Sequence, residues 1–354
     1  MFLQNWTPGL ISRSSAPARS VDDMSLTRHL DDPESAVRRH FEVTYPHVKE
    51  VRFAATSVPA SSITIDGRSQ SLVTLDRFNP GQPKVLPGAE LAGDSQFDWG
   101  AAGTAFDYRI RLLLAPQDPA GFVAAAGARN LRRRWHKPSS PAAWTELVEA
   151  VADIQTRPSG ASEAGAHPSS TRAARLCGLL ALYEQLYRVP ESYLTQHPLL
   201  LAGPHGGLDE LLGLVDDRLV NDVATLTLLF TESQPELAGH HQQVVSNPTF
   251  DRSSDLGGAD ADLIVDGTLL ELKTVKAPAL NKITVWQLLG YLLADTTDRQ
   301  RIRAVGWYFS RHGYLWRLPV EELLSRLHGG SLDLARAREQ FADVLLASRL
   351  PHDR

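Results

Sequence analysis

The stretch at residues 259–274, ADADLIVDGTLLELKT, contains the pattern around which the rest of the chain is organised. Two β-like runs, at residues 261–265 and 268–274, are joined by Asp266 and Gly267. Asp-Gly between two apolar runs is a strong short-range signal for a hairpin with a two-residue turn. The stretch therefore predicts an antiparallel hairpin whose register is set by its turn.

Four charged residues of this hairpin are expected on one face. The predicted pairs are Val265 with Thr268, Ile264 with Leu269, Leu263 with Leu270, Asp262 with Glu271, and Asp260 with Lys273. Directly opposed residues share a face, so Asp260, Asp262, Glu271 and Lys273 point to the same side. Opposed carboxylates repel by roughly a few tenths of a kcal/mol or more. A divalent cation between them would turn this cost into a binding site.

The composition indicates a globular protein of one large or two ordinary domains. The 354 residues are 43% hydrophobic, which is enough for a sizeable core. The formal net charge of -5 gives no general attraction to nucleic acid, so any such contact must use a local basic patch. The single Cys177 excludes an internal disulfide and fits a reducing cytoplasm. The sequence contains no run of about 18 apolar residues, so no membrane span is predicted.

The N-terminal part is expected to be a disordered lead followed by a small α/β region. Residues 1–23 are rich in Ser, Pro and Arg and lack the apolar core of a signal peptide, and translation could start at Met1 or Met24. Residues 24–98 form the α/β region. Its expected elements are a helix from Pro33 capped by Asp31 or Asp32, strands at 48–55, 62–65 and 71–75, and a loop at 78–98.

A long helical region follows. Residues 99–114 predict a helix that ends before Pro116. Residues 156–171 are rich in Pro, Ser, Gly and Ala and predict a flexible loop. Further helices are expected at 121–130, 141–154, 173–187 and 208–230.

The C-terminal third is expected to form a sheet with helices on both faces. Around the hairpin we expect a strand at 242–246, a helix at 284–294, strands at 303–310 and 314–318, and helices at 320–327 and 332–348. The reverse face of the hairpin is apolar at Ala261, Leu263, Val265, Leu270 and Leu272. Ile264 and Leu269 make the other face apolar near the turn, which a sheet covered on both sides explains. The fold class is therefore α/β or α+β.

The acidic face of the hairpin suits metal-dependent cleavage of phosphodiesters. Asp262 and Glu271 offer hard oxygen ligands to Mg²⁺ or Mn²⁺, and the backbone carbonyl of Leu272 could add another. Such a metal lowers the pKa of bound water and offsets charge on phosphorus. Lys273 could then orient or deprotonate that water. Asp260 is the alternative ligand to Asp262.

A second motif lies on the helix that follows the hairpin. Gln287 and Tyr291 are four residues apart and share one helical face, where they could position a nucleic-acid strand or hold Lys273. Together, Asp262, Glu271-Leu272-Lys273 and Gln287-Leu288-Leu289-Gly290-Tyr291 resemble the PD-(D/E)xK nuclease superfamily. The glutamine–tyrosine pair is similar to the RecB-like branch, which includes Cas4-like and AddB-like nucleases.

The resemblance extends loosely to an earlier helix. That branch carries a Gly-Thr-x-x-His motif, and Gly103-Thr104-Ala105-Phe106-Asp107 resembles it with Asp107 at the histidine position, where it could be a metal ligand or pair with Arg111. The resemblance implies a restriction-endonuclease-like mixed sheet flanked by helices, with DNA as substrate and RNA as an alternative. The nuclease-like domain would span residues 99–328, with a helical insertion at about 116–240, followed by a C-terminal helix at 329–354.

The segment between Asp118 and Glu146 contains basic residues and no acidic residue. Its arginine and lysine side chains could neutralise phosphates. The expected nucleic-acid contacts are Arg132, Arg133, Arg134 and Lys137, with Arg311 at a turn near the sheet. Asp222 or Glu232, near the end of a long predicted helix, could complete the site as a further carboxylate. Because the chain has no Gly-x-x-x-x-Gly-Lys-Ser/Thr P-loop, any DNA unwinding would need a partner such as a helicase.

Two other functions remain open from the sequence. The altered Gly-Thr-x-x-His motif would suit a nucleic-acid-binding protein that has lost catalysis on a nuclease fold. Alternatively, the hairpin acids are solvated, and the helical region is a surface for another protein.

Overall fold

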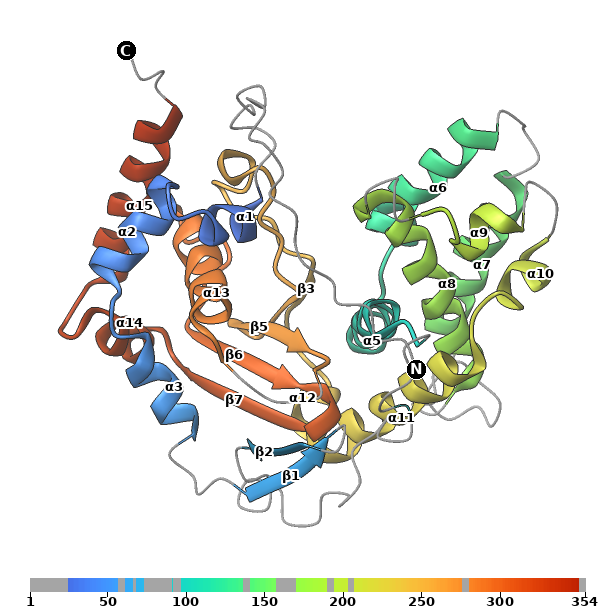
Figure 1. Ribbon diagram of the computed structural model, residues 1–354, viewed down its shortest axis with the longest axis horizontal. Helices are drawn as coiled ribbons and strands as arrows, with labels where there is room; N and C mark the ends of the chain where they lie inside the picture. The colour runs from blue at the N-terminus through green and yellow to red at the C-terminus, as the bar shows by residue number, and fades with distance from the viewer. Residues whose placement is uncertain are drawn as a thin grey trace, which may run out of the picture.

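The computed structural model describes residues 25–56, 61–65, 68–72, 91, 97–135, 141–156, 170–189, 194–202, 207–275 and 280–349. They form a sheet-containing lobe and a helical lobe (Figure 1). The predicted lead at 1–23 and most of the predicted loops at 78–98 and 156–171 lie outside the described residues.

The sheet lobe is built on five strands in sequence order. They are β3 (Val244–Ser246), β4 (Leu263–Val265), β5 (Thr268–Lys273), β6 (Ala304–Phe309) and β7 (Tyr314–Pro319). Only the β5–β6 pair is parallel, and the other three pairs are antiparallel. The fold is thus α+β with an open mixed sheet.

The predicted hairpin register is confirmed. Val265 pairs with Thr268, and Leu263 pairs with Leu270. Asp266 and Gly267 have φ values of 44° and 76°, as a two-residue type I′ turn requires.

The β4–β5 ladder is shorter than expected. β4 begins at Leu263, so the strand predicted from residue 261 was too long by two residues. Asp262 leaves the ladder, and its side-chain Oδ2 accepts a hydrogen bond from the Leu272 amide at 2.7 Å. The two strands therefore separate at the position where the opposed carboxylates were expected.

Both faces of the sheet are covered by helices, as predicted. Ile264 and Leu269 pack in one core with Trp286. That core unites N-terminal and C-terminal helices: α1 (Leu26–Asp31), α2 (Ala36–Thr44), α3 (Val48–Thr56), α13 (Lys282–Ala294), α14 (Val320–His328) and α15 (Leu334–Arg349). On the opposite face, Leu263, Val265, Leu270 and Leu272 pack against Phe106 and Phe230.

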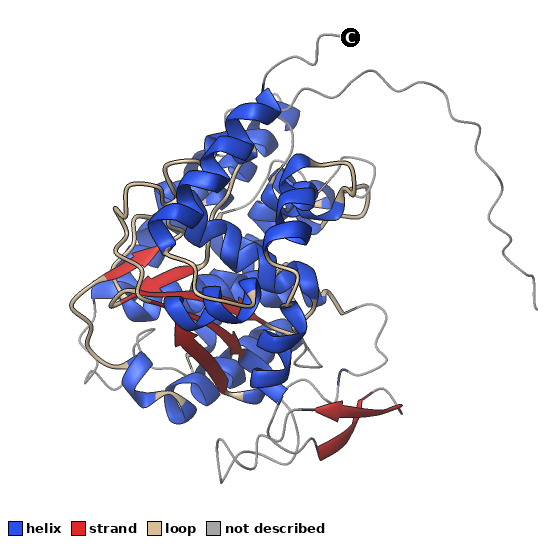
Figure 2. Cartoon of the chain, turned by 90° about the vertical axis from the view of Figure 1, so that its left-hand side faces the viewer, coloured by secondary structure: helices blue, strands red, loops and turns tan. Residues whose placement is uncertain are grey.

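The N-terminal expectations needed two corrections. Residues 48–55 form helix α3, not a strand, because Val48 and Val51 are buried in the core beside α13 and α14. Helix α2 begins after Ser35, while Asp32 ends α1, so neither Asp31 nor Asp32 caps α2. The strands predicted at 62–65 and 71–75 correspond to β1 (Ser61–Ile65) and β2 (Arg68–Leu72), which pair as a separate hairpin apart from the main sheet (Figure 2).

The helical lobe surrounds α8. Its elements are α5 (Trp99–Leu114), α6 (Val123–Trp135), α7 (Pro141–Thr156), α8 (Thr171–Arg188), α9 (Pro198–Leu201), α10 (Leu208–Leu212), α11 (Asp217–Ser233) and α12 (Pro235–Ala238). The long helix predicted at 208–230 is divided, since Asp216 caps α11 by accepting from the Arg218 amide. Gly127 lets α6 cross α8 closely, because a Cβ there would lie 1.6 Å from the Tyr183 carbonyl oxygen.

A buried ion pair joins the two lobes. Arg311 follows β6 and donates to both carboxylate oxygens of Asp222 on α11, each at 2.7 Å. The two side chains are 1% and 0% exposed. The expectation that Arg311 contacts nucleic acid was therefore wrong, as was Asp222 as an additional site carboxylate, because each is buried against the other.

Among the described residues, no helix has the length and apolarity needed to cross a bilayer.

Removing Arg311 should destabilise the protein far more than breaking an exposed ion pair. Arg311→Met should lower the free energy of unfolding by about 3–5 kcal/mol, because it leaves Asp222 charged and buried without its cation. Arg303→Gln, which breaks the exposed pair with Asp298 (Nη2–Oδ2 2.9 Å), should cost less than about 1 kcal/mol. Urea unfolding measures both, and equal losses would contradict a structural role for Arg311.

Candidate active site

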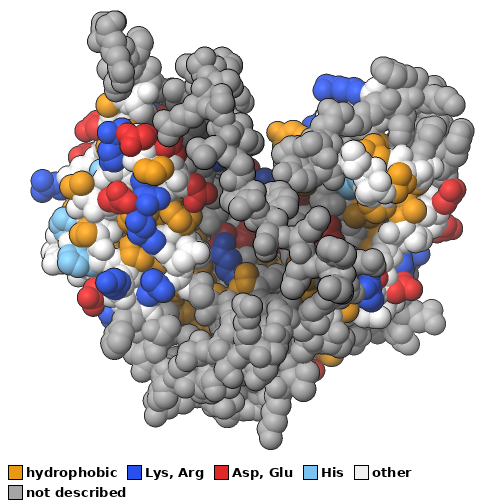
Figure 3. Space-filling view, viewed as in Figure 1, with side chains coloured by type: hydrophobic (Ala, Val, Ile, Leu, Met, Phe, Trp, Pro, Cys, Tyr) orange, Lys and Arg blue, Asp and Glu red, His pale blue; other side chains and the backbone are white. Residues whose placement is uncertain are grey.

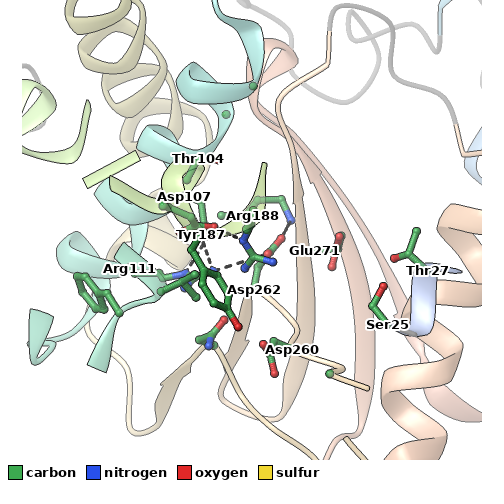
Figure 4. A pocket seen from close by; sticks show the side chains of 18 of the residues that line it. Ser25, Thr27, Thr104, Asp107, Arg111, Tyr187, Arg188, Asp260, Asp262 and Glu271 are labelled. Carbon is green, nitrogen blue, oxygen red and sulfur yellow. Dashed lines mark hydrogen bonds and ion pairs between the residues drawn. The ribbon is translucent and has the colours of Figure 1, made fainter. Parts of the chain in front are cut away.

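Six of the predicted site residues line a cleft of about 810 Å³ between the two lobes: Asp107, Asp262, Glu271, Leu272, Gln287 and Tyr291. Lys273 is not among the lining residues and reaches the site through Glu271. The surface is hollowed there (Figure 3). Asp107 and Arg111 line the cleft from α5, Asp262 and Glu271 line it from the hairpin, and Ser25 and Thr27 stand beyond Glu271 (Figure 4). Residues separated by more than 150 positions in the sequence therefore share one site.

Asp262 and Glu271 lie side by side at the end of the hairpin. Asp262 is held by the Leu272 amide, while Glu271 is only 6% exposed. Glu271 Oε1 accepts from Lys273 Nζ at 2.7 Å. Its second oxygen, Oε2, is buried without a hydrogen-bond partner in the described part of the chain. Asp260 is exposed and pairs with Thr249 in a β-bridge, so Asp262 is the aspartate held against β5.

Burial and crowding make the Glu271 carboxylate hard to ionise. Burial, followed by the charge of Asp262, raises the pKa of Glu271 from 4.5 to about 7 against the opposing effect of Lys273. This arrangement keeps a carboxylate poised near neutral pH. A cation placed beside it would favour its ionised form.

Arg111 stands between Asp107 and Asp262. Arg111 Nε donates to Asp107 Oδ1 at 2.9 Å, and Nη2 lies 2.5 Å from Asp107 Oδ2 and 3.8 Å from Asp262 Oδ1. Burial raises the pKa of Asp107 to about 8 although Arg111 opposes the shift. The predicted pair with Arg111 is therefore confirmed, and Asp107 also lines the cleft, while its role as a metal ligand stays a prediction.

Gln287 and Tyr291 face the cleft from α13, which Asn281 caps through the Thr284 amide. Gln287 Nε2 donates to the Tyr291 hydroxyl at 2.8 Å, and Tyr291 stacks on Phe250 with ring centroids 5.8 Å apart. Burial and the Glu271 charge raise the pKa of Tyr291, so its phenol stays protonated. Gln287 therefore holds Tyr291, while the Lys273 ammonium bonds Glu271.

The basic run lies on α6 beside the cleft. Arg132 and Arg133 are exposed, and Arg129 on the same helix lines the cleft. The side chain of Arg134 and the whole of Lys137 lie outside the described residues.

Sequence reasoning missed the end of α8. Glu184, Tyr187 and Arg188 all line the cleft. Glu184 is buried and accepts hydrogen bonds from Tyr108 and Arg188. The available signal was a lone acid in an otherwise apolar stretch of helix, which requires a buried partner.

Asp262 and Glu271 supply few protein ligands, which suits Mg²⁺ better than a metal ion that is coordinated entirely by protein groups. Within the described ranges, no group of three or more His, Cys, Asp or Glu is arranged to hold a metal ion. Mg²⁺ usually keeps several waters and takes one or two carboxylates together with substrate phosphates. Asp262 and Glu271, with the unpartnered Oε2, fit that smaller ligand set.

Comparisons of this chain with protein-family models, curated proteins and solved structures found no match.

Glu271 should make the metal-free protein less stable as pH rises. Between pH 4.5 and about 7 the folded protein keeps the Glu271 proton and the unfolded chain releases it, so stability falls across this interval. Glu271→Gln removes this effect. The free energy of unfolding of the variant, relative to that of wild type, should therefore rise by about 1–3 kcal/mol from pH 4.5 to about pH 7. Denaturant unfolding in EDTA at several pH values measures this. Glu236→Gln at an exposed position is the control, and a pH-independent difference for Glu271→Gln would contradict the assignment.

Proposed function

We propose that this protein is a Mg²⁺- or Mn²⁺-dependent nuclease that hydrolyses phosphodiester bonds of DNA. The observation that carries the proposal is that Asp262, held by the Leu272 amide, and the buried Glu271, bonded to Lys273, line the same cleft. A carboxylate pair with a neighbouring lysine is chemistry that phosphodiester hydrolysis uses.

Each residue has a defined role in the proposal. Asp262 and Glu271 would hold the metal, with the Leu272 carbonyl as a further oxygen. When bound, the metal activates water and offsets charge on the phosphate. Lys273, held 2.7 Å from Glu271, would orient the attacking water or stabilise the developing charge. The Tyr291 hydroxyl, held by Gln287, would donate a hydrogen bond to a phosphate oxygen.

The same reasoning extends to the fold. The order β3, β4–β5 hairpin, α13 and β6, with β5 and β6 parallel, supports a restriction-endonuclease-like arrangement. The helical lobe would then be an insertion that builds the second wall of the cleft. Repair, recombination or defence against foreign DNA is the setting that such an activity suggests.

Purified protein should cleave DNA with Mg²⁺ or Mn²⁺ and lose this activity in EDTA. Asp262→Asn, Glu271→Gln and Lys273→Met should each reduce the cleavage rate by about 10²-fold or more, because each removes a metal ligand or the charged group beside it. Cleavage of labelled DNA, followed on gels, measures the rate.

Asp260→Asn is the matched control, since it neutralises a nearby carboxylate that β5 does not hold. It should retain activity within about threefold. Full activity of Asp262→Asn together with loss in Asp260→Asn would transfer the ligand role to Asp260. Retention of cleavage in both Glu271→Gln and Lys273→Met would remove the site assignment.

A second function, DNA binding without catalysis, is favoured by one observation. Arg111 already supplies a positive charge to Asp107 and Asp262, and so occupies the role of a cation at this site. If Arg111 never leaves, the carboxylates need no metal.

Calorimetry with Mg²⁺ separates the two functions. We expect wild type to bind Mg²⁺, and Arg111→Gln to bind it about tenfold tighter, because the substitution removes a like charge beside Asp262. Glutamine still donates a hydrogen bond to Asp107, and thermal unfolding checks that the variant is folded. Binding by Arg111→Gln but none by wild type would favour the non-catalytic function.

A further inference from the structure

The end of α8 presents an aromatic ring and a cation to the cleft. Tyr187 is 57% exposed although it lines the cleft, and the neighbouring Arg188 side chain is 55% exposed. Figure 4 shows both side chains between Asp107 and Asp260. Tyrosine offers an aromatic face for stacking, and arginine offers a fixed positive charge that binds phosphate.

Hydrogen bonds to buried groups of the helical lobe hold the Arg188 side chain in place. Its Nε donates to the buried Glu184, which also accepts from the Tyr108 hydroxyl. The Tyr108 oxygen in turn accepts from the Ala124 amide at 3.2 Å. This chain of bonds joins α5, α6 and α8, so the cation is oriented before any ligand arrives.

Charge across the cleft points to an anionic ligand on this wall. The opposite wall carries Asp260, Asp262 and Glu271, which repel a phosphate backbone. The cations that line the helical side are Arg111, Arg129 and Arg188, beside the acids Asp107 and Glu184, which pair with Arg111 and Arg188. Burial lowers the pKa of Arg188, but Glu184 and, more weakly, Tyr108 and Asp260 raise it above its usual value. A strand entering the cleft would therefore place its phosphates toward α6 and α8.

The burial of Glu271 favours a flexible strand over a duplex. Glu271 Oε2 is buried, so a scissile phosphate must enter the cleft to approach it. A cleft of about 810 Å³ is in the range of sites for small ligands, whereas duplex DNA is stiff over roughly 150 base pairs. Unpaired bases can turn outward and stack on an aromatic ring.

We propose that Tyr187 and Arg188 form a binding subsite for one unpaired nucleotide of single-stranded DNA, in which Tyr187 stacks on the base and Arg188 binds a phosphate. This subsite would make single-stranded DNA the substrate of the nuclease. Its biological role rests on the proposed nuclease function. Binding itself can be measured without catalysis.

The test is binding of fluorescent oligothymidylate and of a duplex of equal length, followed by anisotropy in EDTA. Wild type should bind the single strand about tenfold tighter or more. Tyr187→Ala should weaken single-strand binding about 5- to 100-fold, the loss expected for one stacked base. Tyr187→Phe, which keeps the ring, should bind within about twofold of wild type, and duplex binding should not change.

Arg188→Gln should reduce the slope of log affinity against log salt by about 0.7, as expected for one lost phosphate contact on a single strand. Arg172→Gln, an exposed position in the first turn of α8, is the matched control and should leave the slope unchanged. Thermal unfolding verifies that each variant is folded.

Unchanged single-strand binding in Tyr187→Ala, a preference for the duplex, or tighter binding of oligouridylate than of oligothymidylate would overturn the subsite. These outcomes leave the nuclease proposal standing if cleavage still depends on Glu271. Conversely, a protein that never cleaves DNA but binds single strands through Tyr187 retains the subsite and loses only the nuclease.

Discussion

The two-residue turn at Asp266 and Gly267 is the constraint on which the site depends. Side chains alternate faces along a strand, so a slip of one residue would move Glu271 to the other side of the sheet. Both turn residues adopt positive φ, which Asp tolerates and Gly adopts freely. The turn therefore holds Glu271 on the cleft side and brings Asp262 to the point where the strands separate.

Each buried acid around the cleft has its own cation. Lys273 holds Glu271, Arg111 holds Asp107, and Arg188 holds Glu184. Asp262 differs, because one oxygen takes a backbone amide and the other is 3.8 Å from Arg111. These ion pairs offset the repulsion between the closely spaced carboxylates, so the folded protein can accommodate them. Asp262 Oδ1 is thus left without a cation at hydrogen-bond distance among the described residues.

The cleft exists because the two lobes share structural elements. Helices α5 and α11 pack on the sheet through Phe106 and Phe230 and also belong to the core of the helical lobe. The Arg311–Asp222 pair adds a buried contact between α11 and the end of β6. The wall formed by α8 is thereby held opposite the hairpin, which is the geometry that both proposals require.

The sequence by itself determined what neighbouring residues control. Local sterics and periodicity were enough for the turn, the hairpin register, the two apolar faces and helices α5 and α13, so Asp262, Glu271, Lys273, Gln287 and Tyr291 could be chosen from the sequence. Only the tertiary structure decided which partner each charge meets. Arg311 resembles a solvated turn residue until Asp222, 89 positions away, is packed against it. Likewise, residues 48–55 became helix α3 and Glu184 became a cleft residue, because burial and ion pairing depend on contacts between distant segments that local pattern does not encode.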